Sequence, residues 1–287
     1  MKFKKVKYDF VQKYSRTFQH VFKSHYNKDN ILIKKFNTDI LKIDLGTESK
    51  KLEKHIIDCL YKKKIIHTKK IQLNKIHEYI TSDNTNEESN NDVTRNKLTE
   101  VFFEKDEVFF KIYFSMITKI KKKLKFNFLF QKDPFLRFNF PTKNKVDTLL
   151  PHVDLAIGHP PGEVNLWLPL TSVTKSNSMS VSNLKKSMLF FKKFDFDFDY
   201  YSKIYNKKIW KMALGILKPY IAKQGETIVF DSRVMHKSLL NNSKKTRVSL
   251  DFRILPTDLQ KIAKMYRGTG YKKQKFQKGH YYDSRII

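Results

Sequence analysis

The sequence is poor in cysteine and in long apolar runs, and both scarcities limit what the protein can be. Cys59 is the only cysteine among 287 residues, which excludes an intrachain disulfide and a cysteine-based zinc site. No segment approaches the roughly 18 consecutive apolar residues that a membrane-spanning helix needs. The first residues, MKFKKVKYDF, lack the apolar run of a secretory signal. Together these features predict a soluble, intracellular protein located in the cytoplasm, without a membrane span.

Acidic residues are also scarce relative to basic ones. The chain has 58 Lys and Arg against 28 Asp and Glu, a formal net charge of +30. Such a balance attracts anions: nucleic acid, an acidic membrane surface or a phosphorylated substrate. However, basic runs such as 119–125 lack the glycine-rich or repeated aromatic setting of a nucleic-acid module. We therefore interpret the charge as a solvated surface and keep nucleic acid only as a less favoured partner.

The first part of the chain is expected to be a helical N-terminal layer, 1–125, within a single domain that covers 1–287. Apolar residues at helical spacing predict a helix over 50–64. A second helix is predicted over 94–123, with an apolar stripe that must pack on a neighbour. Its members are Phe102, Phe109, Ile112, Met116 and Ile120. The polar stretch 81–94 between the two helices has no apolar periodicity and is expected to be a surface loop or a disordered insertion.

Residues 126–256 are expected to form the β core. Short β-rich stretches separated by turn residues occur at 135–140, 153–157, 163–170, 178–181, 227–230 and 247–255. An insertion is predicted at about 182–223, with a helix through Trp210, Leu214 and Leu217, and a basic tail at 257–287. The predicted fold class is α+β with a mainly β core, in which the helical layer supports a small antiparallel barrel.

Three residues of this core are suited to hold a metal. His152 and Asp154 are two residues apart in a predicted strand, so their side chains share one face. His236 closely follows the predicted strand 227–230. Two histidines and one carboxylate are the ligands of a non-haem iron(II) centre, which leaves positions open for a co-substrate and O2. A His-x-Asp motif alone is a weak signal, and His236 could instead be a hydrogen-bonded histidine at a strand end.

Shortly after His236, the stretch 247–255 alternates strictly between polar and apolar residues. Arg247 and Ser249 share a face, and an arginine with a neighbouring hydroxyl is suited to bind a dicarboxylate. The alternative is a solvated face on which Arg247, Asp251 and Arg253 pair with one another. We favour the binding site because Arg247 lies so soon after His236.

These segments resemble the iron(II)/2-oxoglutarate-dependent oxygenases, and more narrowly the streptomycin-biosynthesis-type subgroup. The matching text is HVDLAIGHPPGEVNLWLPLT at 152–171, GETIVFDSRVMHKSLLNN at 225–242 and TRVSLDFRILP at 246–256. Residues 131–138 resemble the first barrel strand of that family. The resemblance covers about 130–256, with a departure at 182–223. It implies a double-stranded β-helix, the jelly-roll or cupin-like barrel.

The resemblance also implies roles for individual residues. It assigns His152, Asp154 and His236 to iron(II) and catalysis, Arg247, Ser249 and Asn165 to 2-oxoglutarate, and Arg137, Trp167 and Asn177 to the substrate. Arg137 could equally be a surface arginine of a barrel strand, and Arg253 is a second candidate for the carboxylate clamp. Asp231 either orients His236 or caps a turn. His159, in a loop with two prolines, is expected to lie outside the metal site.

The implied activity is that of an iron(II)/2-oxoglutarate-dependent dioxygenase. It would hydroxylate or otherwise oxidise a small polar metabolite, sugar-like or anionic, using O2 and releasing succinate and CO2. One alternative is a basic protein that binds or modifies nucleic acid on the same barrel. Another is a metal-binding cupin without oxygenase activity, which would have no need of Arg247 and Ser249. The sequence carries no signal for an oligomeric state.

Overall fold

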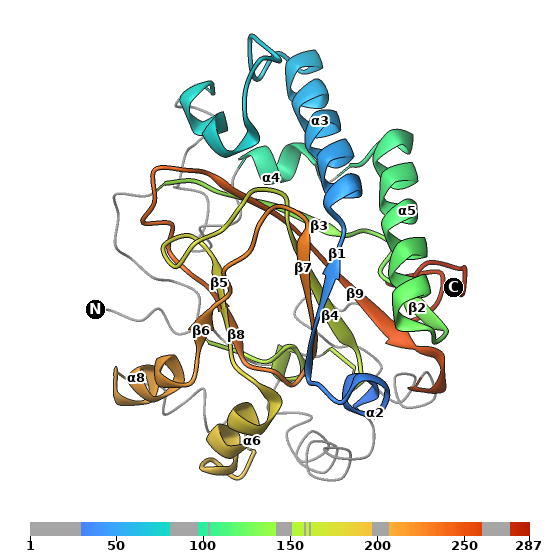
Figure 1. The fold of residues 1–287 in the computed structure, drawn as a ribbon, viewed down its shortest axis with the longest axis vertical. Coiled ribbons are helices and arrows are strands. Elements are labelled where there is room, and N and C mark those ends of the chain that lie inside the picture. The colour runs from blue at the N-terminus through green and yellow to red at the C-terminus, as the bar shows by residue number, and fades with distance from the viewer. Residues whose placement is uncertain are drawn as a thin grey trace.

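The structure is a computed structural model, and it describes residues 30–80, 97–102, 104–141, 151–157, 159–160, 162–196, 207–259 and 276–287. Its largest element is a six-stranded antiparallel sheet in the order β1-β7-β4-β9-β2, with β3 also paired to β9 (Figure 1). The strands are β1 Ile40–Asp44, β2 Phe128–Phe130, β3 Phe135–Asn139, β4 Val164–Pro169, β7 Glu226–Asp231 and β9 Arg247–Pro256. The predicted loop at 81–94 lies outside the described residues.

A smaller antiparallel sheet has the order β6-β5-β8. Its strands are β5 Met179–Val181, β6 Lys218–Pro219 and β8 His236–Ser238. An isolated bridge between His152 and His236 continues this sheet beyond β8. The mixture of helices with antiparallel sheet confirms the coarse α+β prediction.

The predicted helices form, with different bounds. Helix α3 covers Gly46–Lys62 and buries Leu52, Ile56 and Leu60, the residues that predicted it. The second predicted helix is two helices, α4 Lys97–Val101 and α5 Glu107–Leu124. Asp106 separates them, because its side chain accepts a hydrogen bond from the backbone N–H of Phe109 and so caps the start of α5. The remaining α-helices are α2 Ile31–Phe36, α6 Leu184–Lys192 and α8 Lys207–Gly215, and the 3-10 turns are η1 Leu73–Glu78, η4 Asp154–Ile157 and η5 Thr257–Leu259.

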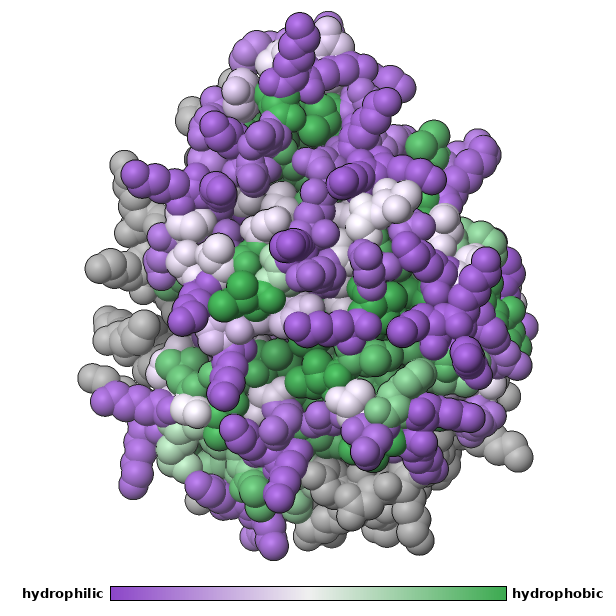
Figure 2. All heavy atoms as spheres, viewed as in Figure 1, coloured by the Kyte–Doolittle hydropathy of each residue, from purple (hydrophilic) through white to green (hydrophobic). Residues whose placement is uncertain are grey.

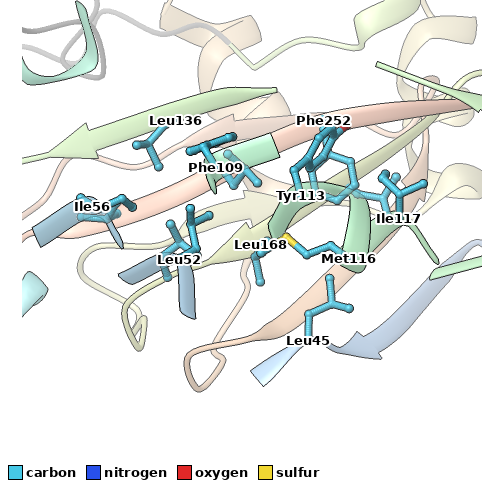
Figure 3. Close-up of a cluster of buried hydrophobic side chains, with 14 of the residues drawn as sticks. Leu45, Leu52, Ile56, Phe109, Tyr113, Met116, Ile117, Leu136, Leu168 and Phe252 are labelled. Atoms are coloured by element: carbon cyan, nitrogen blue, oxygen red, sulfur yellow. The ribbon is translucent and has the colours of Figure 1, made fainter. Parts of the chain in front are cut away.

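The two faces of the large sheet have different partners. Leu168 on β4 and Phe252 on β9 pack against α3 and α5 in the larger apolar core (Figure 3). Trp167 on β4 and Ile228 on β7 lie on the opposite face of the sheet and belong to a second core with β5, α6 and α8. Strand alternation thus separates a structural face from a face that looks toward the smaller sheet.

The turn into β7 depends on a glycine. Gly225 has φ +87°, and a Cβ atom at this position would lie 2.4 Å from the Cα of Gly46 at the start of α3. The carbonyl of Gly225 accepts a hydrogen bond from the backbone N–H of Leu45. Two backbones therefore meet here at a distance that only glycine allows.

The structure corrects several sequence expectations. The predicted strand at 153–157 is the 3-10 turn η4, because the backbone turns back here and the N–H of His159 donates to the carbonyl of Asp154. The N-terminal layer is not wholly helical, since β1 pairs with β7 at the edge of the large sheet. The predicted insertion contributes β6 to the smaller sheet. In the predicted tail, Phe276, Tyr281 and Tyr282 are buried in a cluster beside β2.

Surface properties agree with a solvated basic exterior. On the face drawn in Figure 2, hydrophilic residues are spread widely between apolar ones and do not form a single stripe. Within the described ranges, no helix combines the length and apolar character needed to cross a bilayer.

Candidate metal centre

The structure brings the three predicted metal ligands together. His152, Asp154 and His236 each offer a ligand atom, and these atoms all lie within 4.8 Å of one another. The Nε2 atoms of His152 and His236 are 3.7 and 3.4 Å from Oδ1 of Asp154. Ligands at right angles around an ion with bonds of about 2.1 Å stand about 3 Å apart, so a small closure would complete a metal site.

The two oxygens of Asp154 have different surroundings. Oδ2 accepts a hydrogen bond from Nε of Arg253 at 2.9 Å and forms an ion pair with Nη2 of the same residue at 2.7 Å. Oδ1 is buried and finds no hydrogen-bond partner among the described residues. A buried polar atom without a partner calls for an explanation such as a bound ion. Oδ1, and not Oδ2, is therefore the oxygen of Asp154 that is available to a metal ion.

Electrostatics keep this carboxylate charged. Burial by itself would raise the pKa of Asp154, but Arg253 and the nearby histidines outweigh it and hold the pKa well below its usual range. An anionic, fully buried oxygen beside two imidazoles is the donor set that a divalent cation needs.

The ring of His236 is oriented by the backbone. Its Nδ1 lies 3.0 Å from the carbonyl oxygen of Val234. Since a carbonyl only accepts, Nδ1–H is the donor, and Nε2 keeps its lone pair for a metal. Asp231 does not orient this ring: both of its oxygens accept hydrogen bonds from the buried side chain of Arg233 in the turn before β8.

Backbone pairing brings the two histidines together. His152 and His236 exchange two backbone hydrogen bonds, of 3.1 and 2.9 Å. Their ring centroids are 4.5 Å apart. Asp154 reaches the same point from the first residue of η4, where the backbone N–H of Leu155 donates to the carbonyl of Ser232. The predicted convergence is therefore correct, whereas the predicted strand geometry behind it is wrong.

Arg247 is fully buried at the start of β9. Its Nη1 donates to the carbonyl oxygens of Asn177 and Ser178, at 3.2 and 2.9 Å. Its guanidinium carbon is 5.9 Å from the ring centroid of Trp167. These contacts hold the guanidinium in a fixed direction, as a receptor for a carboxylate requires.

Two other residues predicted to bind 2-oxoglutarate lie on the same side of the sheet. Asn165 pairs across the ladder with Arg253. Both side-chain polar atoms of Asn165, and Oγ of Ser249, are buried without a hydrogen-bond partner among the described residues. Polar atoms of this kind fit the wall of a pocket for a polar ligand.

The predicted substrate residues have mixed surroundings. Trp167 is buried opposite Asp251 and Ile228 in the sheet. Arg137 forms an ion pair with Asp251, whereas Arg247 and Arg253 have other partners, so the alternative in which Arg247, Asp251 and Arg253 pair with one another is not found. The side chain of Asn177 accepts from the backbone N–H of Thr174 and closes a turn, while its carbonyl holds Arg247.

The sequence reasoning missed a buried network behind the metal ligands. Arg253 was considered only as a carboxylate clamp or a surface pair, and it instead holds Asp154. Glu163 and Tyr282, which were given no role, hydrogen-bond to each other at 2.6 Å. The alternation of Glu163 with Asn165 along one strand face was a usable signal. Tyr282, in the predicted tail, carried none.

A second group of ligand-type residues lies between α3 and α5. His55, Cys59 and Asp106 have ligand atoms within 4.8 Å of one another, a group that the sequence reasoning did not predict. Nε2 of His55 is 2.8 Å from Asp106 and 3.4 Å from Sγ of Cys59. Burial raises the pKa of the Cys59 thiol to about 11. These atoms already hydrogen-bond to one another, whereas Oδ1 of Asp154 has no hydrogen-bond partner among the described residues.

Comparison with known proteins places this site in context. No protein-family model matches the chain. Over 120 residues the chain is 28% identical to the streptomycin biosynthesis protein StrG of Streptomyces griseus. The matched stretch covers 42% of this chain and 43% of StrG. The match therefore spans less than half the length of that relative.

Solved structures with a similar arrangement include two 2-oxoglutarate-related proteins. The carbocyclase SnoK from nogalamycin biosynthesis, described as non-heme and alpha-ketoglutarate dependent, is 11% identical with a TM-score of 0.46, over 80% of this chain and 84% of SnoK. HygX from Streptomyces hygroscopicus, solved with nickel and 2-oxoglutarate bound, is 11% identical with a TM-score of 0.46, over 80% of this chain and 87% of HygX. These likenesses are distant, and the assignment depends on the residues of the site itself.

The chain resembles the iron(II)/2-oxoglutarate-dependent oxygenases, as the sequence predicted. The sequence similarity to a streptomycin biosynthesis protein agrees with the subgroup that the sequence analysis named.

Proposed function

We propose that this protein is a non-haem iron(II)/2-oxoglutarate-dependent dioxygenase that oxidises a small polar metabolite, anionic or sugar-like. Its core is a double-stranded β-helix, and His152, Asp154 and His236 are the iron ligands. Two antiparallel sheets, of which the smaller is extended by the His152–His236 bridge, support that fold. The assignment is carried by Oδ1 of Asp154, a buried anionic oxygen that faces two imidazole nitrogens and has no other partner among the described residues.

The balanced reaction consumes one O2 and one 2-oxoglutarate for each C–H bond oxidised. One oxygen atom enters the substrate as a hydroxyl group, and the other enters succinate as CO2 leaves. Bound iron(II) supplies the activation of O2, which no side chain of the protein can provide. The protein contributes the ligand set, the carboxylate receptor and a pocket from which bulk water is kept.

Arg247 and Ser249 bind the distal carboxylate of 2-oxoglutarate in this proposal. The carbonyls of Asn177 and Ser178 hold the guanidinium, so little conformational entropy is lost when the carboxylate binds. The hydroxyl of Ser249 is on the same strand face and has no partner among the described residues. Asn165 is paired across the sheet with Arg253, the partner of Asp154, and in this proposal its side chain hydrogen-bonds to the 2-oxo acid.

The test is anaerobic titration of the metal-free protein with iron(II) and then 2-oxoglutarate. We expect a weak visible charge-transfer band that requires both additions. Asp154→Ala and His236→Ala should each abolish the band and the release of succinate, because each removes a ligand. Asp258→Ala, which removes an exposed carboxylate, is the matched control and should behave like wild type.

The absence of the band in correctly folded wild-type protein would contradict the proposal. So would unchanged succinate release in Asp154→Ala. Substrate classes can then be screened by substrate-stimulated succinate release, with sugar-like compounds and their phosphorylated forms in parallel arms.

A further inference from the structure

Arg253 controls how Asp154 presents itself to the metal. Nε of its planar guanidinium donates to Oδ2 at 2.9 Å, and Nη2 forms an ion pair with the same oxygen at 2.7 Å. Two guanidinium nitrogens against one oxygen restrict the rotation of the carboxyl group and leave the other oxygen facing the two histidines. Without this grip, a carboxylate can rotate and offer both oxygens to the ion.

Arg253 is itself held by a second buried carboxylate. Its Nε lies 3.8 Å from Oε2 of Glu163, and Glu163 is fully buried. A lone guanidinium beside a divalent cation would repel it. The negative charge of Glu163 offsets that repulsion, and the low dielectric of the interior makes the effect larger than it would be in water.

Glu163 is fixed by donors from two other segments. The hydroxyl of Tyr282 donates to Oε1 at 2.6 Å, and Nδ1 of His159 is 2.6 Å from Oε2. Burial, and then the charge of Glu163, keep the pKa of Tyr282 well above its usual range, so the phenol retains the proton that it donates. The loop histidine that was expected to lie outside the metal site therefore lies behind it.

The C-terminal segment holds Tyr282 in place. Tyr282 is fully buried in a cluster with Leu129 and Leu255. The next residue, Asp283, donates its backbone N–H to the carbonyl of Phe130 on β2 at 2.9 Å, so the segment is attached to the edge of the large sheet. A chain of direct contacts leads from this segment through Glu163 and Arg253 to Asp154.

We propose that Glu163 and Tyr282 are positioning residues of the metal centre, which hold Arg253 so that Asp154 offers a single oxygen to the ion. Neither residue touches the metal. The inference rests on the proposed function and adds to it a role for the C-terminal segment.

The experiment is calorimetric titration with Ni(II), a redox-inert substitute for iron(II). All proteins carry Cys59→Ser, so that the His55, Cys59 and Asp106 group does not contribute. Glu163→Gln and Tyr282→Phe should each weaken Ni(II) binding about 10- to 100-fold, as the loss of an outer partner of a metal ligand usually does. Because Tyr282 acts only through Glu163, the double variant should bind no more weakly than Glu163→Gln alone.

Tyr113→Phe is the matched control. Tyr113 is also a buried tyrosine that donates a single hydrogen bond, in its case to the carbonyl of Gln131 at 2.7 Å, and it belongs to α5. It should lower the thermal unfolding midpoint about as much as Tyr282→Phe and leave Ni(II) affinity unchanged. If Glu163→Gln and Tyr282→Phe fold and bind Ni(II) as tightly as the parent protein, this inference is overturned and the proposed function is not. Failure of the parent protein to bind Ni(II) would overturn the proposed function as well.

Discussion

Replacing Arg247 by methionine tests the 2-oxoglutarate receptor separately from the metal centre. Methionine has a similar length but no charge and no donors, so the change removes the carboxylate clamp while much of the volume stays filled. A hydrogen bond to a charged partner contributes about 1.5–3 kcal/mol, and a guanidinium makes two of them with a carboxylate. The dissociation constant of 2-oxoglutarate should therefore rise at least about 100-fold.

The same change has a cost in the unliganded protein. The carbonyl of Asn177 loses the donor that Arg247 provides, and a buried carbonyl left without a partner costs about 1–3 kcal/mol, whereas the carbonyl of Ser178 still accepts from the backbone N–H of Leu239. We therefore expect a lower unfolding midpoint in addition to the loss of affinity. Ni(II) affinity should not change, because the hydrogen bonds of Arg247 within the described residues go to Asn177, Ser178 and Ser238 and not to a proposed metal ligand.

The assay measures the anaerobic charge-transfer band as a function of 2-oxoglutarate at saturating iron(II). Ser249→Ala is the graded control: it removes one neutral hydrogen bond, worth about 0.5–1.5 kcal/mol, and should weaken binding by roughly 3- to 10-fold. An Arg247→Met protein that is folded, binds Ni(II), and shows a wild-type dissociation constant for 2-oxoglutarate would refute the assignment of the clamp.

Three further predictions concern other parts of the molecule. Gly225→Ala should cost more than about 2 kcal/mol of unfolding free energy in urea titrations, since the new Cβ meets the backbone of Gly46. Gly279 also has a positive φ of +81°, but a Cβ there would meet nothing within 4 Å, so Gly279→Ala should cost only about 1 kcal/mol. Equal losses in the two variants would contradict the steric argument. Cys59→Ser should leave the rate of succinate release unchanged, and a large loss would show that the group with His55 takes part in catalysis. Removing the metal with a chelator should abolish succinate release and iron(II) should restore it, while zinc(II), which binds but has no redox chemistry, should not.

Local pattern was sufficient for strand β9 and for helix α3. The alternation at 247–255 predicted β9 and assigned Arg247 and Ser249 to one face, and both side chains are buried there. Leu52, Ile56 and Leu60 predicted α3 because helical periodicity places them on one face. These features depend on spacing along the chain, which the sequence contains completely.

The sequence did not predict the short or irregular elements. Strand β8 has only three residues and η4 only four, too few for a periodic pattern. The split between α4 and α5 lies at the cap formed by Asp106, within the charged run at 104–107. Such boundaries depend on individual hydrogen bonds that no period reveals.

What the sequence determined by itself was the inventory of the site: two histidines, one carboxylate and an arginine on a strand, with the spacing of an iron(II) and 2-oxoglutarate centre. Only the tertiary structure decided which oxygen of Asp154 faces the histidines and which is held by Arg253. It also decided that Tyr282, far along the chain, is linked to Asp154 through Glu163 and Arg253. The physical reason is that ion pairs and buried hydrogen bonds act over a few ångströms in space, and separation along the sequence says nothing about which side chains will meet at that distance.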